Sequence, residues 1–88
     1  DIVSVNEQTK EVLFAECKWQ HRVDARNVLA TLKEKAARVE WNDGARKEYY
    51  AVFAKTFKEK TVPDDDALLF DLKDIEKILR PGTSPAKG

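Results

Sequence analysis

The chain has 88 residues, of which 36% are charged, and its sixteen basic residues balance its sixteen acidic ones. This length allows one small domain with a modest core, and the formal net charge of zero excludes binding to nucleic acid through bulk charge, so a basic site must be local. The single cysteine excludes an internal disulfide and a multi-cysteine zinc site, which suits a reducing cytoplasm.

Two further features concern the context of the domain. No apolar run approaches the roughly 20 residues of a membrane span, so we expect no membrane partner. The chain contains no methionine and starts directly on strand-like residues. We therefore expect a domain that is truncated at its N-terminus and belongs to a longer protein.

The first third of the chain predicts a β-hairpin. Apolar residues alternate with others over residues 1–5 and 12–19, and the segment between them, 6–10, is polar and turn-like. If Asp1 lies opposite Glu16, paired residue numbers sum to seventeen. One face of the hairpin then carries Asp1, Val3, Val5, Val12, Phe14, Glu16 and Lys18. Cys17 points to the other face and is expected to be a buried small hydrophobe.

The remaining elements predict an α/β domain over residues 1–80. Asp24 is a candidate N-cap for a helix that runs to about Trp41 with one apolar stripe. Residues 49–54 are apolar on both faces, which favours a parallel strand reached by a crossover. A polar connector over 56–66, a buried strand over 67–70 and a short helix over 72–79 follow, and residues 81–88 predict a disordered tail.

An acid and a lysine stand two residues apart at the end of the second strand. A buried carboxylate is costly unless it binds a cation or a partner, and a neighbouring lysine can hold a water or a phosphate. Two carboxylates, from Asp1 and Glu16, would bind a hard divalent cation such as Mg²⁺. The competing interpretations are an ion pair between Glu16 and Lys18, and a solvated terminal residue at Asp1.

The order strand, strand, helix, strand, strand, helix, with Asp on the first strand and Glu-x-Lys on the second, resembles the core of restriction-endonuclease-like folds. More narrowly, the amino-acid sequence resembles the C-terminal PD-(D/E)xK nuclease-like domain of a family of archaeal ATPases that carry a P-loop motor domain upstream. The matching stretches are residues 1–3, 9–19, 23–26, 32–35, 46–51 and 68–72.

The resemblance implies a mixed sheet, with an antiparallel hairpin followed by parallel crossover strands, between flanking helices. It also implies catalytic roles for Asp1, Glu16 and Lys18, and a Mg²⁺ or Mn²⁺ ion held by Asp1, Glu16 and the backbone carbonyl of Cys17. The expected partners are DNA, an ATPase domain in cis and a second copy in a homo-oligomer. The alternative is a catalytically inactive DNA- or protein-binding module with the same fold.

Three residues just past Lys18 suit contact with the DNA backbone, namely Trp19, Arg22 and Arg26. A tryptophan is also a common core or interface anchor, so both interpretations of Trp19 stay open. His21 is expected to be a surface loop residue. Lysines and arginines at positions 33, 35 and 38 are expected to form the solvated face of the helix, because Glu34 and Glu40 interrupt any basic stripe.

Overall fold

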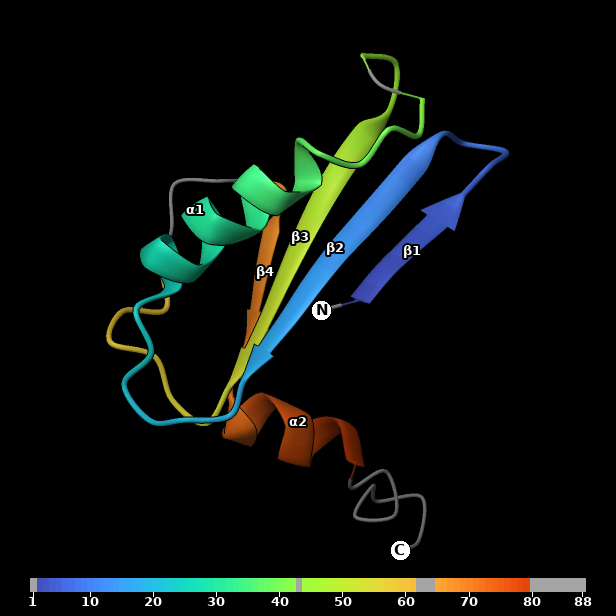
Figure 1. The fold of residues 1–88 in the computed structure, drawn as a ribbon. Coiled ribbons are helices and arrows are strands. Elements are labelled where there is room, and N and C mark those ends of the chain that lie inside the picture. The colour runs from blue at the N-terminus through green and yellow to red at the C-terminus, as the bar shows by residue number, and fades with distance from the viewer. Residues whose placement is uncertain (1, 43, 62–64, 80–88) are drawn as a thin grey trace, which may run out of the picture.

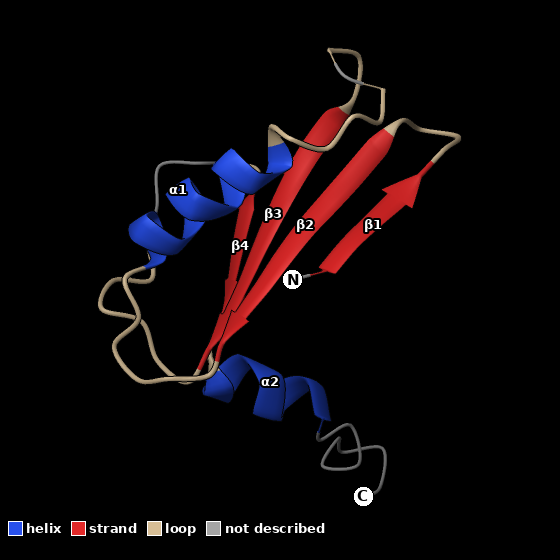
Figure 2. Ribbon diagram, in the orientation of Figure 1, coloured by secondary structure: helices blue, strands red, loops and turns tan. Residues whose placement is uncertain are grey.

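The computed structural model describes residues 2–42, 44–61 and 65–79. The elements in chain order are β1 (Ile2–Asn6), β2 (Glu11–Lys18), α1 (Ala25–Ala36), β3 (Lys47–Ala54), β4 (Ala67–Phe70) and α2 (Leu72–Leu79). The four strands form one sheet with α1 across one of its faces, and α2 lies beyond the end at which β2, β3 and β4 finish (Figures 1 and 2). The protein is therefore a small α/β domain with a mixed sheet and two helices.

The strand order is β1-β2-β3-β4, with β1 antiparallel to β2 and the two later pairs parallel. Val3 pairs with Phe14 and Val5 with Val12, so the predicted hairpin register is confirmed. The tight turn follows from Asn6, whose Oδ1 accepts hydrogen bonds from the backbone N–H groups of Gln8 and Thr9 at 3.0 and 3.2 Å. The predicted crossover is also confirmed, since α1 connects β2 and β3, which are parallel and adjacent in the sheet.

The core lies between α1 and the sheet. Alternation along β2 and β3 directs side chains of both strands toward the helix, and the rings of Phe14 and Tyr50 stack with centroids 5.8 Å apart. The buried core residues on the strands and helix are Val12, Phe14, Leu29, Leu32, Ala36, Tyr50 and Val52. This layer fixes the position of α1 over β2, and with it the position of every side chain on the helix.

Helix α1 begins where the sequence predicted, because the Asp24 carboxylate accepts a hydrogen bond from the N–H of Asn27. The prediction that it runs to Trp41 is wrong, since the helix ends at Ala36. Where the chain leaves the helix, the Arg46 guanidinium donates to the carbonyls of Ala36, Val39 and Trp41 at 2.6–2.9 Å. These carbonyls are satisfied by a side chain from outside the helix, so the chain can leave the helical path early.

Two expectations of burial, for Cys17 and for the strand at 67–70, are corrected. Cys17 is exposed, because the face of the sheet opposite α1 carries no helix at that point among the described residues. The strand at 67–70 is at the sheet edge and Leu68 is 51% exposed, so it is not a buried strand. In α2, Ile78 and Leu79 are 63% and 72% exposed. Neither helix in the described segments is long and apolar enough to cross a membrane.

The predicted tail at 81–88 lies outside the described residues, as do Asp1 and the last residue of the predicted domain, Arg80. Strand β1 forms one edge of the sheet and exposes apolar side chains. Its residues Ile2, Val3 and Val5 are 65%, 51% and 44% exposed. An unpaired apolar edge strand is a surface onto which another strand can add.

Candidate functional site

Glu16 is the buried acid of the domain core. It lies near the carboxyl end of β2 and follows Val12 and Phe14 on the face that α1 covers. The residue is only 8% exposed, and its charged side chain is 9% exposed. A carboxylate in this position must be compensated by nearby positive charge or by a ligand.

Two lysines provide that compensation. Lys18, on the same face of β2, places its Nζ 3.2 Å from Glu16 Oε2, and Lys35, from the last turn of α1, places its Nζ 3.6 Å from Oε1. Both ammonium-bearing side chains are 46% exposed, whereas the Glu16 side chain is 9% exposed. Oε1 is buried and has no hydrogen-bond partner within the described part of the chain. The ion pair that competed with the catalytic interpretation is thus present, but it leaves one carboxylate oxygen without a hydrogen bond.

A pocket of about 170 Å³ opens between the end of β2 and α1. Its lining residues are Glu16, Lys18, Asn27, Val28, Thr31 and Lys35. The pocket joins one buried acid to two cations and to the side chains of Asn27 and Thr31, which can donate or accept hydrogen bonds. Such a site suits a phosphate oxygen, a water or a hydrated cation better than an apolar ligand.

The loop after Lys18 is held against the loop after β3 by backbone hydrogen bonds. Val23 N donates to Thr56 O at 2.9 Å, and Lys58 N donates to Val23 O at 2.9 Å. The N–H of Arg22 donates to Thr56 Oγ1 at 2.7 Å, while Arg22 itself has a positive φ of 55°. These bonds fix the loop at the mouth of the site.

A second pocket of about 270 Å³ adjoins the first and shares Lys18, Asn27 and Val28 with it. Arg22 and Lys58 also line it. Arg26 lines a third pocket, of about 320 Å³, in which Lys58 again takes part. The predicted DNA-binding residues Arg22 and Arg26 therefore line two neighbouring pockets that share Asp24 and Lys58, and Glu59 also lines the pocket of Arg26.

The other residues near the loop are exposed. Trp19 is 43% exposed, so the interpretation of this residue as a core anchor is wrong. His21 is exposed, as predicted, with its Nδ1 3.4 Å from Thr56 Oγ1. Tyr50 is buried and Tyr49 half-buried, so these two side chains belong to the core and its rim.

Two lysines of this region were not predicted as site residues. Lys35 was assigned to the solvated face of the helix, yet it contacts Glu16. The signal that could have found Lys35 is its position seven residues after the half-buried Val28. Residues seven apart lie on the same side of a helix, so Lys35 lies beside the apolar stripe that faces the sheet. Lys58 carried no such signal, because only the pairing of Val23 with Phe57 brings its loop to the site.

The described residues fit a divalent cation in part. Mg²⁺ keeps several waters and is commonly bound through one or two carboxylates together with substrate phosphates. Glu16 offers one carboxylate with an unsatisfied oxygen, but two ammonium groups lie beside it. No group of three or more His, Cys, Asp or Glu side chains suited to a metal occurs within 2–42, 44–61 and 65–79. The second predicted carboxylate, Asp1, lies outside those residues.

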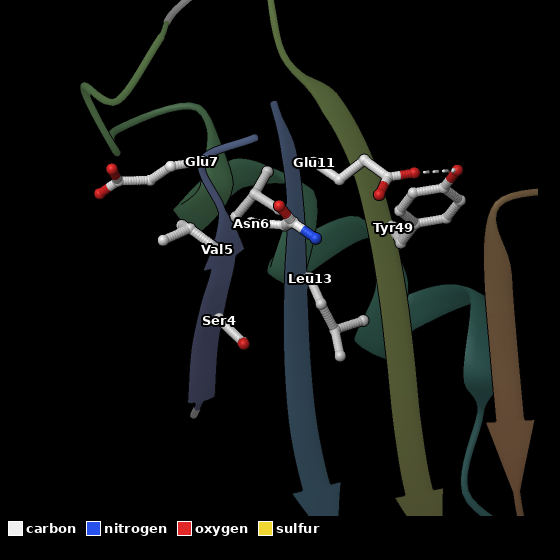
Figure 3. A pocket seen from close by; sticks show the side chains of 8 residues that line it. Ser4, Val5, Asn6, Glu7, Glu11, Leu13 and Tyr49 are labelled. Carbon is white, nitrogen blue, oxygen red and sulfur yellow. Dashed lines mark hydrogen bonds between the residues drawn. The ribbon is translucent and has the colours of Figure 1, made fainter. Parts of the chain in front are cut away.

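Another pocket, of about 480 Å³, lies elsewhere, at the hairpin end of β1 and β2. Figure 3 shows Glu11 and Tyr49 meeting across β2 and β3, with the Glu7 side chain extending away from them. Tyr49 donates a hydrogen bond to Glu11 at 3.2 Å, and burial together with this bond raises the pKa of Tyr49. Glu11 begins β2 and Glu16 is near its end, so these two acids lie about 17 Å apart along the strand.

Comparison with known proteins gives one informative relative. The chain is 33% identical over 77 residues to a protein of the archaeon Methanocaldococcus jannaschii described as "Uncharacterized protein MJECL04". The match covers 85% of this chain but only 17% of the relative. No protein-family model matches the chain, and no solved structure matches it.

Proposed function

We propose that this chain is a metal-dependent, nuclease-like DNA-processing domain with a restriction-endonuclease-like core. The observation that carries the proposal is the buried Glu16 carboxylate, which has one oxygen without a hydrogen bond and faces a polar pocket beside Lys18. The mixed sheet supports the proposal, because its hairpin and crossover place Glu16 and Lys18 on one face at the carboxyl end of β2. Burying a carboxylate destabilises the protein unless counter-charges or a ligand compensate it, and such buried charged groups cluster at functional sites.

In this proposal Glu16 is a ligand of Mg²⁺ or Mn²⁺, with Asp1 as the second carboxylate and the Cys17 carbonyl as a further oxygen ligand. The ion, when bound, neutralises phosphate charge and lowers the pKa of a bound water. Lys18 holds the attacking water or the scissile phosphate, since its ammonium lies on the same face as Glu16 and remains half-exposed. The polar pocket borders the buried carboxylate and has room for a hydrated ion or a phosphate oxygen.

DNA would approach along the neighbouring pockets of Arg22 and Arg26. Arg22, Arg26 and Lys58 line them, and their charges suit consecutive phosphates of a backbone. Trp19 is exposed next to Lys18 in the chain and offers a ring on which a base or sugar can stack. The balance of charge over the whole chain means that association depends on this side of the domain alone.

The proposed setting is a cytoplasmic archaeal protein with a P-loop ATPase domain in cis. The archaeal relative and its greater length are compatible with this setting, although its description says nothing about activity. The apolar edge strand β1 supports self-association into a homo-oligomer.

One observation favours the second candidate function, a catalytically inactive DNA- or protein-binding module. Lys18 and Lys35 both lie within ion-pair distance of Glu16, so the carboxylate is compensated without a metal. In that case the lysines serve to hold α1 and β2 together, and the cations around Arg22 provide the binding surface.

A cleavage assay on the full protein that contains this chain separates the two functions. DNA is incubated with Mg²⁺ or Mn²⁺ and wild type, Glu16→Gln or Lys18→Met, with Glu34→Gln on the exposed side of α1 as the matched control. We expect Glu16→Gln to reduce metal-dependent cleavage by at least about 100-fold and to leave DNA association intact, because it removes an anionic ligand and preserves shape. If Glu16→Gln cut DNA as fast as wild type, the binding-module function would replace the catalytic one.

A further inference from the structure

The position of Lys35 raises the question of how a cation would reach Glu16. The two oxygens of this carboxylate have different surroundings: Oε2 is 3.2 Å from Lys18 Nζ, while Oε1 is buried and 3.6 Å from Lys35 Nζ. The distance from Lys35 to Oε1 exceeds a normal hydrogen bond. Oε1 is thus neutralised by charge but retains unused acceptor capacity.

We propose that Lys35 is a positioning residue that occupies the cation site of Glu16 in the metal-free protein and is displaced when a divalent cation binds. This inference rests on the proposed metal site at Glu16. Lys35 rather than Lys18 is displaced, because it covers the oxygen that lacks a hydrogen bond. Its long side chain is 46% exposed and can turn into solvent without moving α1.

Two consequences follow from this competition. In the metal-free protein the Lys35 ammonium offsets the cost of burying Glu16, so its removal destabilises the domain. In the metal-bound protein the same ammonium must leave, so its removal strengthens cation binding. A lysine that only stabilises the fold would give the first effect without the second.

The test measures Mn²⁺ and Mg²⁺ binding to the full protein by isothermal titration calorimetry, without DNA. The variants are Lys35→Met, which keeps most of the apolar stem, and Lys35→Gln as a second neutral replacement. The control is Arg38→Met, which removes a positive charge from an exposed residue just after α1. Glu16→Gln serves as the reference that lacks the ligand.

We expect Lys35→Met and Lys35→Gln to lower the metal Kd about fivefold relative to wild type, which equals about 1 kcal/mol, the upper range for a partly exposed ion pair. Arg38→Met should leave the Kd unchanged, and in EDTA the Lys35 variants should melt about 4 °C lower. Metal binding that requires Glu16 but is not strengthened in either Lys35 variant would overturn the role of Lys35 alone. Absence of metal binding in wild type and in the Lys35 variants would overturn the proposed metal site together with this inference.

Discussion

Arg46 is the residue on which the geometry of the site most depends. Its side chain is 2% exposed, and it donates hydrogen bonds of 2.6–2.9 Å to Glu48, to the carbonyl of Ala36 at the end of α1 and to the carbonyls of Val39 and Trp41 beyond it. Its guanidinium also lies 5.6 Å from the centroid of the Phe14 ring. It thereby ties the end of α1, the turn that carries Lys35, to the sheet beneath.

Replacement by alanine should cost about 3–5 kcal/mol, the range for removing one partner of a buried charged network. An 88-residue domain is stable by only about 4–13 kcal/mol, so Arg46→Ala should lower the melting temperature by at least about 12 °C. Arg46→Lys should be intermediate, because an ammonium cannot reach three carbonyls at once.

Thermal and urea unfolding, followed by circular dichroism, measures these changes. Arg38→Ala is the matched control: its side chain is exposed in the same segment, and its effect should stay within about 0.5 kcal/mol. If Arg46→Ala lowered the free energy of unfolding no more than Arg38→Ala, the carbonyls at the end of α1 would find other donors at no cost, and Arg46 would not hold the helix end to the sheet.

Three further predictions concern single groups. The hydrogen bond from Lys60 lowers the pKa of Asp74 to about 2. The ionised Asp74 therefore stabilises the start of α2 fully above about pH 4, and this stabilisation is lost as the pH falls through about 2. A carbon-13 NMR titration in which Lys60→Met left the pKa of Asp74 unchanged would contradict this role of Lys60. Charge reversal at Arg22 and Arg26 should weaken DNA association and lower by about two the number of counterions released on binding. If the slope of log binding constant against log salt concentration, measured by fluorescence anisotropy, stayed unchanged, the DNA would bind elsewhere. Cys17 should react stoichiometrically with Ellman's reagent in the native protein because it is exposed, and a reaction that needs denaturant would show that another surface covers it.

Local patterns in the sequence predicted much of the fold. Alternation in residues 2–18 and the polar turn at Asn6 fixed the hairpin register, because a slip by one residue would turn Val12 and Phe14 away from the core. Asp24 predicted the helix start, since a cap depends on neighbouring residues only. Alternation also placed Glu16 and Lys18 on one face, which is the part of the candidate site that a sequence can predict.

The tertiary structure decided what depends on residues far apart in the chain. The end of α1 could not be predicted, because the carbonyl of its last residue, Ala36, accepts a hydrogen bond from Arg46, ten residues further along the chain. The exposure of Cys17 follows from which face of the sheet a helix covers, a property that alternation alone does not specify. Lys35 and Lys58 join the site only because α1 packs across β2 and the loop after β3 pairs with Val23. Strand pattern determined which face of β2 carries the acid, and packing determined which cations compensate it.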